Sequence, residues 1–487
     1  MFKSFLGGVH PNDGKSYSMD KAIETPPIPA EVVIPMSQHI GAPCTPIVKV
    51  GDHVKKGQLI GTTDAFMHSP IHASTSGDVV KIEERSHVSR LKCLSVVIKS
   101  DGLDEWADGL PMKRNWVEME KKDILDAIKQ GGVVGMGGAT FPAHIKLAPN
   151  KPVDVLIINA AECEPYLTAD YRAMIEYSAR IVEGIEILMK VLGVEKCYIG
   201  IEDNKPKAIQ IMKEAVSGRT VASTSISSDD YYSTTVHRDK GSSIEVAALQ
   251  TKYPQGAEKM LIKVVTGREV PTGGLPMDVG AVVHNVGTVI AVDDAVVFGI
   301  PLIERVTSVT GDAVTEPKNL LLRVGASFKE VIEFCGGFKV KPGKLVSGGP
   351  MMGMAIADVS VPVTKGTSGI LILSQAAAEV GEESPCIRCG RCVKACPMGL
   401  IPSMLSIMGE RRDYRTAKES YGLFNCIECG SCVYTCPAKR NIVQYIKYCK
   451  AQNLAEQARE KAKAEAAKAK ATALKEAAAQ EAAAEKK

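Results

Sequence analysis

The sequence predicts a multidomain α/β protein that ends in a helical, cysteine-rich domain, and three observations support this fold class. At 487 residues, the chain is too long for a single hydrophobic core. The β-branched run at residues 153–158 is typical of a buried strand, and polar residues follow it directly. Eight of the 14 cysteines fall in two short runs near the C-terminus. We therefore expect several α/β domains followed by a domain that binds metal.

The composition is that of an ordinary globular protein. Hydrophobic residues make up 45% and charged residues 24%, and the net charge is only +3. Neither this charge nor an aromatic content of 5% favours nucleic-acid binding. The first residues lack the apolar core of a secretory signal, and polar residues interrupt the most apolar segment, 279–303. We expect a cytosolic chain whose cysteines bind metal, because the cytosol keeps thiols reduced.

Residues 1–110 are expected to form a module of short strands. Apolar residues alternate between turn glycines at 50–61 and 71–80. The pattern resembles the barrel-sandwich hybrid fold of biotinyl and lipoyl domains, which carry a modified lysine at a hairpin tip. Phe66 stands at that position here, and the surrounding segment contains no lysine. The sequence therefore favours a structural or docking module over a swinging arm.

Residues 111–310 are expected to form an α/β domain with a ligand site at the edge of its sheet. The glycines at 131–138 would let backbone N–H groups approach a phosphate, which Lys146 would neutralise. The glycines are equally compatible with an ordinary tight connection. The strand at 153–158 leads into a polar turn, and α/β sheets place ligands at the carboxyl ends of strands. The strand and its turn therefore strengthen the ligand interpretation.

The two cysteine runs each fit the C-x2-C-x2-C-x3-C-P pattern of two-cluster ferredoxins, whose fourth cysteine ligates the other cluster. Zinc is the alternative, but it needs only four ligands and no second copy of the run. We therefore predict two [4Fe–4S] clusters with crossed ligation. One cluster is expected to be held by Cys386, Cys389, Cys392 and Cys436, and the other by Cys426, Cys429, Cys432 and Cys396. Helical spacing of apolar residues at 400–409 predicts a helical two-cluster domain over 371–450.

The segments of the middle region resemble the flavin- and NADH-binding subunit of respiratory complex I and related hydrogenases and formate dehydrogenases. In that family a glycine-rich loop, an N-x-D-E-x-E-P turn and a Y-x-x-G-E-E segment surround FMN. The resemblance implies non-covalent FMN contacts from Gly135, Gly137, Gly138, Lys146, Asn159, Glu162, Tyr253, Gly256, Glu258 and Asn285. It also implies that Phe141 and Glu164 face the nicotinamide of NAD(H). The sequence departs from the family pattern at Met136, Thr140 and Ala161.

The remaining segments complete the resemblance. Residues 311–370 resemble the small β-grasp-like (SLBB) domain of complex I relatives, and residues 451–487 form an Ala/Lys/Glu-rich tail without an apolar stripe. Helix propensity and the missing apolar stripe predict a solvated or partly disordered helix for the tail. The order of the segments and the second cluster look like those of RnfC, from the Rnf (Rsx) complexes, which are ion-translocating ferredoxin:NAD oxidoreductases.

This resemblance implies a peripheral electron-transfer subunit on the cytoplasmic side of the cell (inner) membrane. It would exchange hydride between NAD(H) and FMN and pass electrons through the two clusters. Its partners would be an iron–sulfur subunit and integral membrane subunits, with ferredoxin contributing electrons indirectly. Two alternatives remain open, namely a soluble flavin/iron–sulfur NADH dehydrogenase and a cluster-bearing docking subunit with a degenerate flavin pocket.

Overall fold

The computed structural model describes residues 4–218 and 243–484 of the chain. It divides the protein into two compact units, Met1–Val380 and Gly381–Lys487. The first unit contains three sheet-based regions, and the second is helical. The predicted fold class is confirmed. Among the described residues, none of the helices combines the length and the apolar character that a bilayer span requires.

The central region of the first unit is a four-stranded parallel sheet in the order β11-β10-β9-β12. Its strands are β9 (Val155–Asn159), β10 (Lys196–Glu202), β11 (Ser243–Leu249) and β12 (Ala281–Asn285). The strand predicted at 153–158 is therefore confirmed as β9. All four strands run in the same direction, so the residues that follow them meet at one edge of the sheet.

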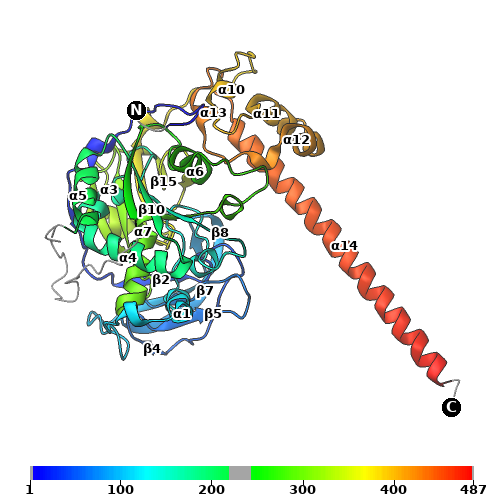
Figure 1. Ribbon diagram of the computed structural model, residues 1–487, viewed down its shortest axis with the longest axis horizontal. Helices are drawn as coiled ribbons and strands as arrows, with labels where there is room; N and C mark the ends of the chain where they lie inside the picture. The colour runs from blue at the N-terminus through cyan, green and yellow to red at the C-terminus, as the bar shows by residue number, and fades with distance from the viewer. Residues whose placement is uncertain (1–3, 219–242, 485–487) are drawn as a thin grey trace. The chain divides into compact units, whose positions relative to one another are not determined.

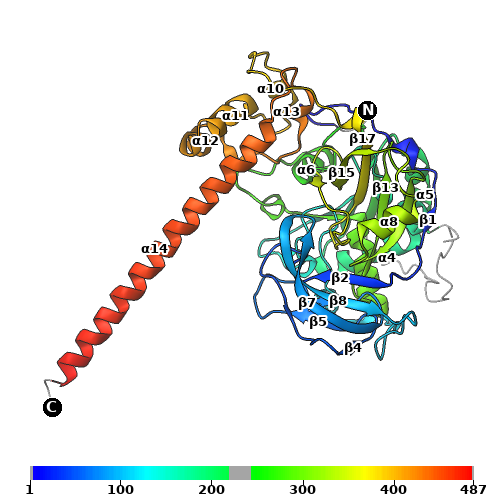
Figure 2. The same ribbon diagram turned by 180° about the vertical axis from the view of Figure 1, so that it is seen from behind.

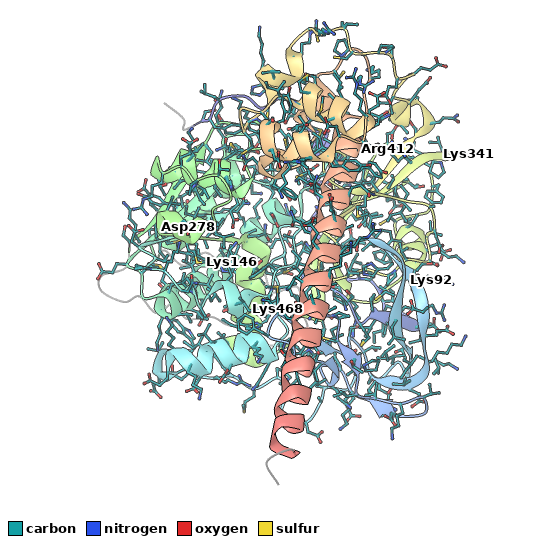
Figure 3. All side chains as sticks on the ribbon, turned by 90° about the vertical axis from the view of Figure 1, so that its right-hand side faces the viewer. Lys92, Lys146, Asp278, Lys341, Arg412 and Lys468 are labelled. Carbon is teal, nitrogen blue, oxygen red and sulfur yellow. The ribbon has the colours of Figure 1, made fainter. Side chains whose placement is uncertain are left out.

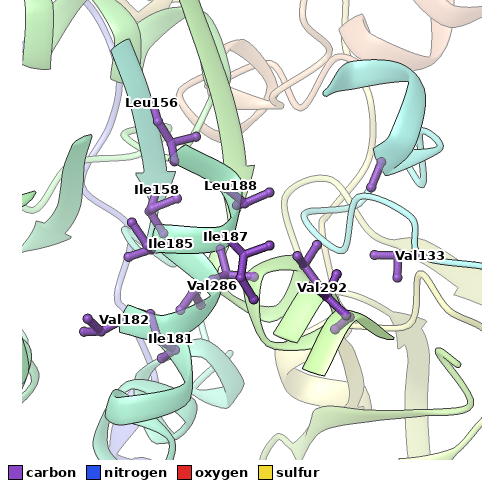
Figure 4. Packing of buried hydrophobic residues seen from close by; sticks show 14 of the residues in the cluster. Val133, Leu156, Ile158, Ile181, Val182, Ile185, Ile187, Leu188, Val286 and Val292 are labelled. Atoms are coloured by element: carbon purple, nitrogen blue, oxygen red, sulfur yellow. The ribbon is translucent and has the colours of Figure 1, made fainter. Parts of the chain in front are cut away.

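Helices pack around this sheet and bury its apolar side chains. They are α1 (Lys121–Gln130), α2 (Ala143–Lys146), α3 (Ala169–Glu176), α4 (Ser178–Leu192), α5 (Pro206–Val216), α6 (Glu258–Thr266) and α7 (Val286–Asp293). Figure 4 shows Leu156 and Ile158 of β9 beside Ile185 of α4 and Val286 of α7. Helices α4 and α7 approach closely, since a side chain on Gly184 would meet the carbonyl oxygen of Val289 at 2.6 Å.

The N-terminal region has two small antiparallel sheets, as the barrel-sandwich prediction requires (Figure 2). One contains β2 (Glu31–Pro35), β4 (His53–Val54), β7 (Gly77–His87) and β8 (Arg90–Ser100). The other contains β3 (Thr45–Pro46), β5 (Leu59–Thr62) and β6 (Ile71–His72). Phe66 lies in the loop between β5 and β6 with 83% of its surface exposed. The position that carries lysine in swinging-arm domains therefore presents an apolar side chain to solvent.

A six-stranded mixed sheet forms the third region, in the order β1-β14-β13-β17-β15-β16. Its strands are β1 (Ile23–Glu24), β13 (Glu304–Thr310), β14 (Lys318–Arg323), β15 (Pro342–Ser347), β16 (Met354–Ile356) and β17 (Gly369–Ser374), accompanied by α8 (Phe328–Phe334) and α9 (Gln375–Ala378). Strand β1 comes from the N-terminal segment and pairs in parallel with β14. The N-terminal residues thus help to build a sheet whose other strands follow more than 270 positions later.

The second unit is helical, and the helices expected at 400–409 and 414–423 are confirmed. Its helices are α10 (Arg391–Ala395), α11 (Pro402–Glu410), α12 (Tyr414–Tyr421), α13 (Ser431–Tyr434) and α14 (Ile442–Ala484). Helix α14 has 43 residues and extends well beyond α11 and α12 (Figure 1). Ile446 and Cys449 are fully buried, whereas all side chains from Leu454 to Lys468 are exposed. The tail is thus helical with a solvated face all round.

Candidate cofactor sites

Two asparagines end adjacent strands at the carboxyl edge of the parallel sheet. Asn159 of β9 and Asn285 of β12 are paired in register. The Asn159 Nδ2 group donates to the carbonyl oxygen of Gly256 at 2.8 Å. The Asn285 Oδ1 atom accepts from the backbone N–H of Gly287 at 2.9 Å, which caps α7, and its Nδ2 group donates to Asp170 at 2.7 Å. The structure therefore brings three of the predicted residues, Asn159, Gly256 and Asn285, to one edge.

The glycine-rich loop closes on itself beside this edge. The Gly135 N–H donates to the carbonyl oxygen of Phe141 at 2.8 Å, and the Thr140 N–H donates to the Gly135 oxygen at 3.1 Å. A side chain on Gly137 would lie 3.4 Å from the Cβ of Asn285, so the loop packs against the end of β12. Gly138 has a φ of 113° and open space where a side chain would stand. The loop thus exposes backbone at Gly138, as a close approach to a ligand requires.

Lys146 and Glu258 form an ion pair at this edge. Lys146 is the last residue of α2 and is marked in Figure 3, and Glu258 is the first residue of α6. The Lys146 ammonium lies 2.5 Å from the Glu258 carboxylate, and the two side chains are 29% and 38% exposed. The two residues that the sequence assigned to FMN binding are therefore in direct contact. Both remain accessible to a ligand.

Glu162 caps a helix from within the polar turn. Its carboxylate accepts from the backbone N–H groups of Asp170 at 2.7 Å and Tyr171 at 3.2 Å, in the first turn of α3. Burial raises the pKa of Glu162 to about 7, and the nearby Lys15 ammonium opposes this rise. The carboxylate is thus engaged by protein groups. Its predicted contact with FMN remains a prediction.

Glu164 is held by two distant segments. Its carboxylate accepts from the backbone N–H of Met351 at 3.1 Å, from that of Met352 at 2.9 Å, and from the Tyr253 hydroxyl at 3.3 Å. Burial raises its pKa to about 7, and the three hydrogen bonds oppose this rise. Phe141, its expected partner at the nicotinamide, is half-buried. The orientation of either side chain toward NAD(H) remains a prediction.

Three buried lysines organise the surrounding backbone, and no local motif in the sequence distinguishes them from surface lysines. Lys15 donates to the carbonyl oxygens of Glu162 at 2.9 Å, Glu164 at 3.1 Å and Leu167 at 2.6 Å. Lys205 donates to the Ala161 oxygen at 2.7 Å. Lys365 donates to the oxygens of Pro70 and Gly132, both at 2.7 Å.

Lys365 connects the barrel-sandwich region to the start of the glycine-rich loop, because Pro70 belongs to the former and Gly132 to the latter. A second link joins the same two regions, since the Ile40 N–H donates to the Thr140 oxygen at 3.2 Å. The N-terminal region is therefore bonded to the loop that is expected to cradle the flavin phosphate. This gives it a structural role at the site.

The residues present fit a phosphate-bearing polar cofactor. Gln255 stands between Tyr253 and Gly256, is fully buried, and has no hydrogen-bond partner for either amide atom within the part of the chain that the structure describes. An unpaired buried amide costs free energy unless a ligand or water satisfies it. Together with the open backbone at Gly138 and the half-exposed Lys146, it supplies donors suited to FMN.

The three departures from the family pattern are absorbed by backbone and packing. Met136 is buried, and its N–H donates to the Thr288 hydroxyl at 2.8 Å. Thr140 has a φ of 49°, the left-handed conformation that the family's glycine would adopt without strain. Ala161 is fully buried and accepts from Lys205. None of the three is an exposed bulky residue at the loop.

In the second unit, four cysteines line one hollow. They are Cys396 of the first run and Cys426, Cys429 and Cys432 of the second, and Leu405 and Ile446 are among the apolar residues beside them. This is the crossed set expected for one [4Fe–4S] cluster. Within residues 4–218 and 243–484, no three His, Cys, Asp or Glu side chains converge on a single-ion position. The thiols thus surround a space, as a polynuclear cluster requires.

The two runs repeat the same backbone conformation. Arg388 and Glu428 occupy equivalent positions with φ values of 56° and 57°, and Gly390 and Gly430 follow with 73° and 80°. Each glycine precedes a short helix, α10 or α13. The runs differ in exposure, since Cys389 is exposed whereas its counterpart Cys429 is buried.

Family models matched to the chain give the same architecture. Four of them match, an RnfC barrel sandwich hybrid domain (3–103), a Nuo51 FMN-binding domain (128–294), an SLBB domain (306–355) and a 4Fe-4S dicluster domain (379–437). Among solved structures, one chain of a NAD+-reducing [NiFe]-hydrogenase has a TM-score of 0.49 and 18% identity, covering 71% of this chain and 65% of that one.

Curated relatives are similar over nearly the whole chain, and each is the RnfC-type component of its complex. The one from the proton-translocating ferredoxin:NAD(+) oxidoreductase complex of Clostridium ljungdahlii is 58% identical, over 95% of this chain and 97% of the relative. The one from the Na(+)-translocating complex of Acetobacterium woodii is 44% identical, over 93% and 98%. The one from the ion-translocating oxidoreductase complex of Rhodobacter capsulatus is 42% identical, over 94% and 84%.

The fold and the two sites define an electron-transfer oxidoreductase subunit in which a complex I-type flavin domain is joined to a two-cluster domain. Its cofactors are FMN and two [4Fe–4S] clusters. The identity over nearly the full length places the chain more narrowly. It belongs to the RnfC family of ion-translocating ferredoxin:NAD(+) oxidoreductase complexes.

Proposed function

We propose that this chain exchanges electrons with NAD(H) at FMN and relays them through its clusters as the peripheral subunit of an ion-translocating ferredoxin:NAD oxidoreductase complex. The observation that carries the proposal is the presence of both sites in one chain. A flavin-type sheet edge and eight cysteines in two matching runs are needed together only where electron pairs are converted to single electrons.

Bound FMN supplies the step between two-electron and one-electron chemistry, because it accepts a hydride equivalent and the clusters accept single electrons. The protein's residues bind and orient. Gly138 presents backbone and Lys146 a positive charge to the phosphate, while Asn159 and Asn285 fix the sheet edge. Glu164, which Lys15 and Tyr253 help to place, faces the nucleotide in this proposal.

The partners and location follow from the same proposal. We infer that an iron–sulfur subunit and integral membrane subunits hold the chain on the cytoplasmic face of the membrane, and that ferredoxin contributes electrons through them. High salt or a mild chaotrope should then release the chain from membranes, since protein contacts rather than a lipid anchor hold it. Release by detergent alone would contradict a peripheral attachment.

Acid extraction of the purified chain, followed by identification of the released flavin, tests the central claim. One FMN per chain and rapid bleaching of its absorbance by NADH are expected. Cluster iron without flavin would favour the docking subunit with a degenerate pocket. Full NADH dehydrogenase activity toward soluble acceptors, without co-purifying membrane subunits, would favour the soluble enzyme.

A further inference from the structure

The turn between β15 and β16 reaches back to the polar turn of the flavin region. Residues 348–353 form this turn, and the backbone N–H groups of Met351 and Met352 donate to the Glu164 carboxylate at 3.1 and 2.9 Å. The donors and the acceptor are 187 and 188 positions apart. The turn belongs to the SLBB-type region and the carboxylate to the flavin region, so these bonds join two domains at one side chain.

Gly349 makes room for the carboxylate. A Cβ atom at this position would lie 2.2 Å from Glu164 Oε2, 2.7 Å from its Cδ and 2.8 Å from its Cβ. Its φ lies outside the left-handed region, so the backbone itself would accept any residue. The three nearest atoms to such a Cβ are all from the Glu164 side chain. The glycine thus serves the placement of Glu164 rather than the conformation of the turn.

Few charged groups surround the carboxylate. Lys15 approaches from the N-terminal segment and Tyr253 from the segment before α6, while the thiol of Cys163 is adjacent in the chain. Burial and the negative charges of Glu202 and Glu164 raise the pKa of the Cys163 thiol, so it stays neutral. Backbone donors of the turn therefore supply two of the three hydrogen bonds that stabilise ionised Glu164.

We propose that the turn 348–353 is a positioning element for the NAD(H) reaction, which sets the orientation and charge of Glu164 through two backbone N–H groups. The proposal rests on the proposed function, in which Glu164 faces the nucleotide. Oriented hydrogen bonds fix a carboxylate in one rotamer, and a displacement of about 1 Å at such a group is sufficient to slow a reaction by about a hundredfold. The SLBB-type region thereby takes part in the reaction although it contributes no side chain to it.

Gly349→Ala in the full-length chain tests this directly, because the added methyl group must displace the carboxylate. We expect unchanged flavin content and a reduction of the flavin by NADH that is about tenfold slower in stopped-flow measurements. Met352→Ala is the matched control, since it alters the same turn but keeps the backbone N–H. It should react at the wild-type rate.

A double-mutant cycle separates positioning from general damage. In a Glu164→Ala background the added methyl meets no carboxylate, so Gly349→Ala should have no further effect on the rate. The pH dependence gives a second measure, since loss of the N–H donors should move the midpoint assigned to Glu164 upward from about 7.

Each outcome has a distinct meaning. A wild-type rate and an unmoved midpoint in Gly349→Ala would overturn the positioning role, and so would an equal slowing in the Glu164→Ala background. Loss of flavin in parallel with activity would show that the turn only maintains the fold. A wild-type rate in Glu164→Ala itself would instead reject the proposed role of Glu164 toward the nucleotide.

Discussion

The cluster domain and the flavin-type sheet edge are built on opposite principles. Six of the eight cysteines act within runs that place three thiols two residues apart, so local spacing determines their arrangement. At the sheet edge, Lys146 meets Glu258 across 112 positions and Glu164 meets Met352 across 188. Local spacing therefore makes the cluster ligands readable from sequence, whereas the state of each flavin-site residue depends on a distant partner.

The largest expected effect tests how local the cluster sites are. Cys396→Ser should remove the cluster of the second run, because Cys396 lines the hollow with Cys426, Cys429 and Cys432. Iron content should fall from about eight to about four per chain. Iron analysis and electron paramagnetic resonance of the remaining cluster would measure this.

Cys449→Ser is the matched control, since Cys449 is buried in the same unit but lies outside both runs. It should keep all its iron. Loss of the first run's cluster alone in Cys396→Ser would show that each run serves its own cluster. The contrast between local and distant assembly would then be sharper than we describe.

The next effect concerns the pair Lys146 and Glu258. Lys146→Ala should weaken FMN binding by about ten- to a hundredfold, because a charge-assisted hydrogen bond to the phosphate contributes roughly 1.5–3 kcal/mol. Glu258→Gln removes the competing carboxylate and should leave FMN binding equal or tighter. Titration of the apoprotein with FMN, followed by fluorescence, compares the two variants. Equal weakening in both would mean that the ion pair only maintains the loop.

A smaller effect is expected at Lys365. Lys365→Met removes the donor to the oxygens of Pro70 and Gly132, so the free energy of unfolding should fall by about 1–3 kcal/mol. Lys92→Met, at an exposed position of β8, should leave it unchanged. Thermal unfolding of the flavin-free chain measures both. An unchanged midpoint in Lys365→Met would remove the proposed structural link between the barrel-sandwich region and the glycine loop.

The smallest effect is expected at Thr140. A β-branched residue with a φ of 49° is strained by roughly 1–2 kcal/mol, so Thr140→Gly should relieve part of that strain. The gain is offset by the greater chain entropy of glycine when the protein is unfolded. We expect a net change within about 1 kcal/mol and unchanged FMN content. A large loss of FMN would show that the threonine side chain itself contributes to the site.

Sequence reasoning found the elements and the edge but not the bonds between distant segments. The apolar run before Asn159 indicated β9, and the repeated cysteine runs indicated the cluster domain. Nothing local in the sequence marks Lys15, Lys205 or Lys365 as buried, because their carbonyl partners are brought near only by the fold. The same holds for Gly349, whose role is visible only beside Glu164. Strand β1 was likewise unforeseen, since two residues carry too little pattern to indicate a strand.

Helix α14 implies a gradient of local stability along the C-terminal unit. Its 43 residues span about 65 Å at 1.5 Å per residue. Ile446 and Cys449 anchor its first turns in the core, but the exposed stretch from Leu454 to Lys468 is held only by its own backbone hydrogen bonds. Amide hydrogens of that stretch should therefore exchange orders of magnitude faster than those around Cys449, and heating should melt it before the clusters lose their absorbance.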